Sequence, residues 1–136
     1  MDGRTLLDVG RDLAAGPTEA HWRSSVGRAY YALLHEVLGA LRRWGFALPP
    51  RDKVHTFARL KFVYASDPDL KRIGLTLEAL AQLRNAADYQ LGISGPFVSP
   101  KIAVSALADA ESSVALLDAA EVDPARRAGA VRTIPP

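Results

Sequence analysis

The segment from Trp22 to Trp44 constrains the fold more than any other part of the chain. Its apolar residues recur every three or four positions, the spacing of one helix face: Trp22, Val26, Ala29, Tyr30, Leu33, Val37, Ala40, Leu41 and Trp44. The pattern predicts one amphipathic helix of about 26 residues, with Thr18 as its N-cap and Gly45 at its end. A helix of this kind must bury its apolar stripe against other elements.

Four further stretches, 4–15, 52–66, about 69–91 and about 100–121, have the same period. Asp52 is a suitable cap for the third predicted helix, and Ser99 for the fifth. No stretch alternates as a strand does. We therefore predict an all-α fold, an antiparallel up-and-down bundle of about five helices formed by residues 1–121. Residues 122–136, rich in Pro, Ala, Gly and Arg without a period, are predicted to be a flexible basic tail.

Composition excludes several classes of function. The length of 136 residues suits one domain, and the absence of Cys excludes disulfides, thiolate metal sites and cysteine nucleophiles. The three His residues lack the spacing of a zinc site, so we predict no metal and no other cofactor. No apolar run is long enough to span a membrane, and the first residues lack the pattern of a signal peptide. We expect a cytoplasmic protein without membrane contact.

The basic pI of about 9.2 is weak evidence for nucleic-acid binding. Residues 42–72 carry a net charge of +5 and residues 73–121 a net charge of −4, while the sum over residues 1–121 is zero. The surplus of +2 lies after residue 121. The basic and acidic regions could form a polar patch or simply pair with each other.

Arg84 is a misfit, because it lies on the apolar stripe of the predicted helix 69–91. Burying a guanidinium without partners is very costly. One interpretation is that Arg84 pairs with Asp88, four residues later on the same face. The other is that it points into a cleft or subunit interface and meets an anion there. Tyr89 adds a phenol near the end of the helix.

The long second helix has a polar face beside its apolar stripe, carrying Arg28, Tyr31 and His35. Such residues could hold a phosphate and a base, since Arg forks onto phosphate, Tyr stacks and His moves a proton. The simpler interpretation is an ordinary bundle face on which Tyr31 packs and His35 reaches solvent. His21 and His55 have no partners at helical spacing, and we expect them at the surface or at caps.

Two strings resemble the HEPN domain family. SSVGRAYYALLHEVLGAL (residues 24–41) is similar to its pattern S-x-x-R-A-Y-Y-A-x-x-H, and LRNAADYQL (residues 83–91) is similar to its pattern L-R-x-x-A-D-Y. The residues that match are Ser25, Arg28, Ala29, Tyr30, Tyr31, Ala32 and His35, then Leu83, Arg84, Ala87, Asp88 and Tyr89. The resemblance covers residues 4–120, and the order and separation of the two motifs strengthen it.

The resemblance implies a four- to five-helix bundle that dimerises and belongs to a prokaryotic toxin–antitoxin or defence system, often beside a minimal nucleotidyltransferase. Catalytic members of the family are metal-independent ribonucleases in which an Arg is followed, four to six residues later, by a His. Here Arg84 is present, but Tyr89 stands where that His would be, and no His follows His55. A phenol is a poor proton shuttle at neutral pH. His35 could replace the missing His if the second and fourth helices pack side by side.

Three hypotheses follow. The first is a HEPN module with a degenerate or absent ribonuclease motif, which binds a protein partner such as a nucleotidyltransferase, RNA, or both. The second is an active ribonuclease with a site shared across a homodimer, and the third is a nucleotide-binding bundle. Enzymatic activity is left open. The predicted catalytic residues are Arg84, Asp88, Tyr89 and His35, and the predicted RNA- or nucleotide-binding residues are Arg28, Tyr31 and Asn85.

Overall fold

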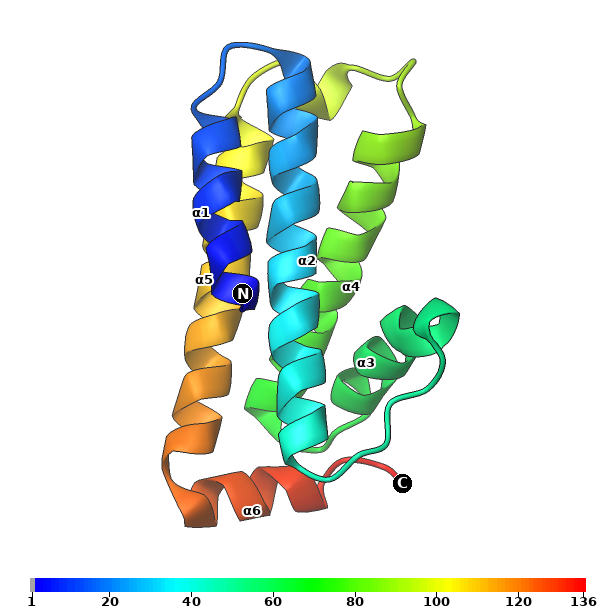
Figure 1. The fold of residues 1–136 in the computed structure, drawn as a ribbon, viewed down its shortest axis with the longest axis vertical. Coiled ribbons are helices and arrows are strands. Elements are labelled where there is room, and N and C mark those ends of the chain that lie inside the picture. The colour runs from blue at the N-terminus through cyan, green and yellow to red at the C-terminus, as the bar shows by residue number, and fades with distance from the viewer. Residues whose placement is uncertain (1) are drawn as a thin grey trace.

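The computed structural model describes residues 2–136, which form six α-helices and two short 3₁₀ turns (Figure 1). The α-helices are α1 (Gly3–Ala14), α2 (Glu19–Arg43), α3 (Val54–Val63), α4 (Pro68–Tyr89), α5 (Lys101–Val122) and α6 (Pro124–Arg132). The 3₁₀ turns are η1 (Arg51–Lys53), directly before α3, and η2 (Gly95–Phe97), between α4 and α5. There is no strand in this part of the chain, so the prediction of an all-α fold is confirmed.

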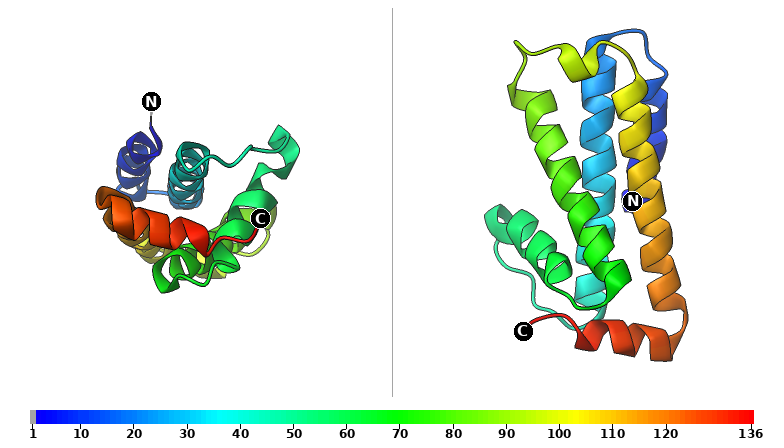
Figure 2. Two further views of the ribbon diagram at one scale, coloured as in Figure 1. Left: turned by 90° about the horizontal axis from the view of Figure 1, so that it is seen from below. Right: turned by 180° about the vertical axis from the view of Figure 1, so that it is seen from behind.

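The four longer helices α1, α2, α4 and α5 run up and down the molecule, with α2 in the middle (Figures 1 and 2). The bundle differs from five equal helices, because α3 is short and lies inclined against the lower part of α4 (Figure 1). Gly74 of α4 allows this close approach, since a Cβ there would lie 2.5 Å from the backbone N of Val63. This contact holds the C-terminal end of α3, while His55 near the start of α3 contacts Tyr30 of α2.

The ends of the helices follow local sequence signals in most cases. Thr18 caps α2 with its side chain, and Gly45 adopts φ +93° directly after the C-cap, as the sequence predicts. The N-cap of α5 is Pro100, so the prediction that Ser99 caps this helix is off by one residue, although the Ser99 hydroxyl accepts a hydrogen bond from the N–H of Lys101. The prediction that Asp52 caps the third helix is wrong, because Asp52 lies within η1 and α3 begins without a side-chain cap.

The core lies where the apolar stripes of the helices meet around α2. Trp44, after the end of α2, stacks on Phe62 of α3 with the ring centroids 5.9 Å apart. These contacts exclude water from the lower half of the bundle. Eight large side chains are essentially inaccessible to solvent: Phe62, Phe97, Leu33, Leu41, Leu70, Ile73, Leu77 and Leu117.

The structure corrects the prediction of a flexible tail after residue 121. The segment forms α6, which crosses the lower end of the bundle (Figure 1) and buries Ala130, and Ile134 beyond the helix is buried as well. Asp123 caps α6, and Arg126 binds Asp67 at the start of α4. A helix of nine residues with one buried residue is too short to show an apolar period, which explains why the sequence pattern missed it.

Arg23 fixes the C-terminal end of α4. Its side chain is almost fully buried, and its Nη1 donates to the carbonyl of Ala87 at 2.9 Å. Its Nη2 donates to the carbonyl of Ile93 at 2.7 Å, and the guanidinium lies 4.3 Å from the ring centroid of Phe97. The last carbonyl groups of a helix lack partners within the helix, so this arginine satisfies them and holds the turn that carries Arg84.

Candidate functional site

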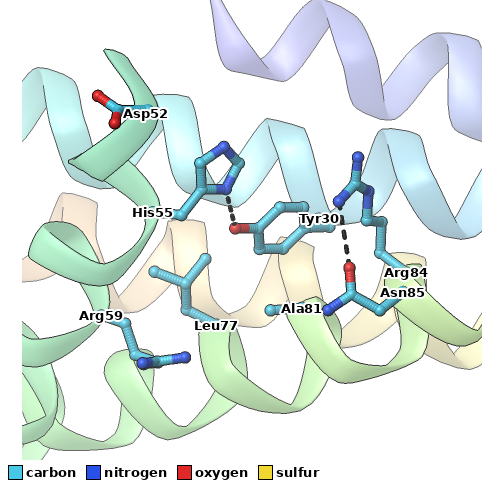
Figure 3. Close-up of a pocket in the computed structure, with 8 residues that line it drawn as sticks. All are labelled: Tyr30, Asp52, His55, Arg59, Leu77, Ala81, Arg84 and Asn85. Carbon is cyan, nitrogen blue, oxygen red and sulfur yellow. Dashed lines mark hydrogen bonds between the residues drawn. The ribbon is translucent and has the colours of Figure 1, made fainter. Parts of the chain in front are cut away.

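A polar cavity of about 270 Å³ lies between α2, α3 and α4 (Figure 3). Both large hydrophobic and charged side chains reach it, from elements that are far apart in sequence. The residues that line it are Tyr30, Asp52, His55, Arg59, Leu77, Ala81, Arg84 and Asn85. Polar groups that converge in a cavity of a helical bundle mark the default place to look for a ligand site.

Arg84 reaches this cavity from the apolar stripe of α4 (Figure 3). Its Nε lies 2.9 Å from Oδ2 of Asp88, and its Nη1 donates to Oδ1 of Asn85 at 3.2 Å. Arg84 therefore pairs with Asp88 and also lines a cavity, while the anion of the second interpretation stays a prediction. The contact with Asp88 lacks the angle of a hydrogen bond, and the buried Nε has no hydrogen-bond partner among the described residues.

Two tyrosine rings flank the guanidinium of Arg84. Its central carbon lies 5.3 Å from the ring centroid of Tyr31 and 5.7 Å from that of Tyr89. Tyr31 is half-buried on α2, whereas 73% of Tyr89 is exposed. Cation–π contacts of this kind hold a guanidinium in place and leave its edge N–H groups free to bind an anion.

Tyr30 and His55 form a hydrogen-bonded pair on the other side of the cavity. The Oη of Tyr30 lies 2.5 Å from Nδ1 of His55, and the two rings are stacked (Figure 3). Burial raises the pKa of the Tyr30 phenol to about 12. Burial, followed by the charges of Arg84 and His35, lowers the pKa of His55 below its ordinary value. Both side chains are therefore neutral at pH 7.

His35 lies near this group and outside the cavity itself. Helices α2 and α4 do pack side by side, which is the condition under which His35 could serve the site. The His35 ring centroid lies 6.5 Å from that of Tyr31, and the side chain lines a neighbouring groove with Arg42 and Arg51. His35 is exposed, so it can reach a ligand that extends beyond the cavity.

The other predicted site residues are divided between the cavity and the surface. Asn85 lines the cavity, and Asp88 lies beside it as the partner of Arg84. Arg28 is exposed and lies against α1, where its Cβ would be 3.3 Å from a Cβ added at Gly10. The structure therefore brings Tyr31, Arg84 and Asn85 together and leaves Arg28 apart from them.

His55 and Arg59 also line the cavity, although no sequence pattern predicts them as site residues. His55 contacts a residue of α2 that is 25 positions earlier, and no periodic pattern links the two. The only local signal is that His55 and Arg59 lie four residues apart and so share one face of α3. The Nε of Arg59 lies 3.8 Å from Oε2 of Glu78, which leaves the guanidinium loosely held.

A comparison with protein-family models, curated proteins and solved structures finds no match for this chain. Among residues 2–136, no cluster of His, Asp and Glu could hold a metal ion. Over the same residues, none of the helices combines the length and the apolar character that a membrane span requires. The resemblance to the HEPN family therefore rests on the two sequence motifs alone.

Proposed function

We propose that this chain is the HEPN-like component of a prokaryotic toxin–antitoxin or defence system, and that it binds single-stranded RNA at the cavity between α2, α3 and α4. The observation that carries the proposal is the placement of Arg84. It is a cation on an apolar stripe, it faces the cavity, and its one hydrogen bond among the described residues goes to Asn85. Arg59 adds a second cation to the same cavity.

The chemistry of the surrounding residues favours RNA over other anions. Arginine binds phosphate through two parallel N–H groups, and exposed aromatic rings stack on unpaired bases. Tyr31 and Tyr89 lie within cation–π distance of Arg84, so a phosphate on Arg84 would place the adjoining bases near these rings. A cavity built only for inorganic phosphate would gain nothing from the rings.

Binding of a fluorescently labelled single-stranded RNA oligonucleotide, followed by anisotropy at low salt, tests the proposal. Arg84→Gln should weaken binding about tenfold, because it removes a charge-assisted contact to phosphate. Arg72→Gln is the matched control, since Arg72 is exposed on the same helix, about 18 Å away along its axis. The control should change the Kd less than about twofold.

Absence of binding by the wild-type chain would overturn the proposal, as would equal losses in Arg84→Gln and Arg72→Gln. A mononucleotide that competes as well as the oligonucleotide would favour the nucleotide-binding alternative instead.

The same samples, incubated with EDTA and analysed on a gel for RNA fragments, test a second candidate function. His35 and His55 both lie close to the Tyr31–Arg84 pair, which favours metal-independent RNA cleavage despite the missing downstream His.

We also propose that the chain acts in the cytoplasm as a homodimer, and that a minimal nucleotidyltransferase is its protein partner. The connection between α4 and α5 supports an interface near Tyr89, because Leu91, Ile93 and Val98 there are each more than half exposed. Apolar side chains that gather beside a functional residue commonly mark a contact surface. Sedimentation velocity should give the mass of a dimer, and a monomer at micromolar concentration would contradict the homodimer.

A further inference from the structure

The pairing of Tyr30 with His55 decides which ring nitrogen of His55 carries its proton. Only 3% of Tyr30 is exposed, and the hydrogen bond with His55 is the sole one that its hydroxyl makes within the described residues. A buried hydroxyl needs an acceptor for its proton, because leaving the donor unpaired costs about 1–3 kcal/mol. The acceptor within reach is Nδ1 of His55, at 2.5 Å.

An Nδ1 that accepts a hydrogen bond cannot also carry the proton of a neutral imidazole. The proton is then on Nε2, which Figure 3 shows on the side of the ring that points away from Tyr30. Nε2 makes no hydrogen bond to any described residue, although Asp52 lines the same cavity. His55 consequently presents an unused N–H group.

We propose that His55 is a neutral hydrogen-bond donor to a phosphate oxygen of the bound RNA, and that Tyr30 is the positioning residue that keeps the proton on Nε2. This inference rests on the proposed RNA-binding function. It gives His55 the role of an uncharged N–H donor in place of a base or a cation. The charged groups around His55 fit this role, because the single acid, Asp52, is outnumbered by Arg59 and Arg84. The other groups around it are aromatic: Tyr30, Tyr31 and His35.

The charges around the cavity explain why a neutral donor suits this position. Burial is the largest cause of the lowered pKa of His55, and Arg84 lowers it further, since a second positive charge beside the guanidinium is unfavourable. A neutral N–H group adds a contact to phosphate without that repulsion. Tyr30 contributes no charge, because burial raises the pKa of its phenol to about 12.

Two matched substitutions separate a neutral donor from a base or a cation. The amide N–H₂ of Gln occupies roughly the place of Nε2, whereas the shorter Asn reaches only the place of Nδ1. His55→Asn should weaken oligonucleotide binding about tenfold, and His55→Gln should stay within about threefold of wild type. Tyr30→Phe should lower the affinity about threefold, since it leaves the His55 proton free to move to Nδ1. Thermal unfolding of each variant checks that it folds.

The proton can also be observed directly in the free protein. Long-range ¹H–¹⁵N correlation spectra at pH 7.5 should show the Nε2–H tautomer of His55 in wild type and a mixture of tautomers in Tyr30→Phe. An Nδ1–H tautomer or an imidazolium in wild type would overturn the inference and leave RNA binding intact. Equal losses of affinity in His55→Gln and His55→Asn would also overturn the inference without contradicting RNA binding. No binding of RNA by wild type would overturn both the inference and the proposed function.

Discussion

Two arginines with low exposure have different roles in this molecule. Arg23 donates hydrogen bonds to backbone carbonyl groups at and after the end of α4, whereas most N–H groups of Arg84 make no hydrogen bond to the described residues and remain free at the cavity. Arg84 was found in the sequence because it interrupts an apolar stripe. The sequence does not reveal the role of Arg23, because the carbonyl groups to which it donates lie more than 60 residues away, although Glu19 also pairs with it at 3.5 Å.

Arg23→Ala should lower the free energy of unfolding by about 3 kcal/mol, because it leaves buried carbonyls without donors. Urea denaturation at pH 7 measures this change. Arg28→Ala is the matched control on the same helix, and since Arg28 is exposed, the change should stay within about 0.5 kcal/mol. If Arg23→Ala does not fold, Arg23→Lys should still lower the midpoint more than the control does. Equal effects of the Arg23 and Arg28 variants would contradict this role for Arg23.

Among the elements, α6 is joined to α4 by ion pairs. Arg126 donates to Asp67 at 2.6 Å and to Asp69 at 2.9 Å, and so ties α6 to the first turn of α4. The hydrogen bond from Arg126 is the largest cause of the lowered pKa of Asp67, and the backbone N–H groups of Leu70 and Asp69 add to it. The contact therefore depends on an ionised Asp67 carboxylate.

Arg126→Ala should lower the free energy of unfolding by about 1 kcal/mol at pH 7. Because the pKa of Asp67 is lower in the folded chain than in the unfolded chain, the contribution is complete above the unfolded pKa and is lost as the pH falls through the folded pKa. The difference between wild type and variant should thus shrink below about pH 4. Urea denaturation at pH 7 and pH 3 measures the difference in the free energy of unfolding between wild type and Arg126→Ala. Arg127→Ala is the control, since Arg127 is exposed. A difference that is the same at both pH values would contradict this account.

Helices α1 to α5 could be located from the sequence because each carries an apolar stripe between clear breaks. The inclination of α3 could not, since it depends on the close approach at Gly74 and on the route of residues 44–53, which have no period. The residues of the candidate site likewise could be predicted only in part. Arg84, Tyr31 and Asn85 come from two periodic helices, whereas His55 and Arg59 join them only through the packing of α3.

Across the whole molecule, part of the uneven charge of the sequence is paired internally. Arg43 of the basic region binds Glu121 of the acidic region at 2.5 Å, and Arg59 lies 3.8 Å from Glu78. These pairs join α2 to α5 and α3 to α4. The overall charge therefore says little about a nucleic-acid partner, and the functional argument depends on the cavity around Arg84.

The most direct test of that argument is to map where RNA binds on the whole chain. A ¹H–¹⁵N correlation titration with a single-stranded RNA oligonucleotide should perturb the signals of Tyr31, His55, Arg84 and Asn85 first and most strongly. Signals of α6, at the far end of the bundle, should change little. Perturbations centred on α5 or α6, or no change at any residue up to millimolar RNA, would contradict RNA binding at the cavity between α2, α3 and α4.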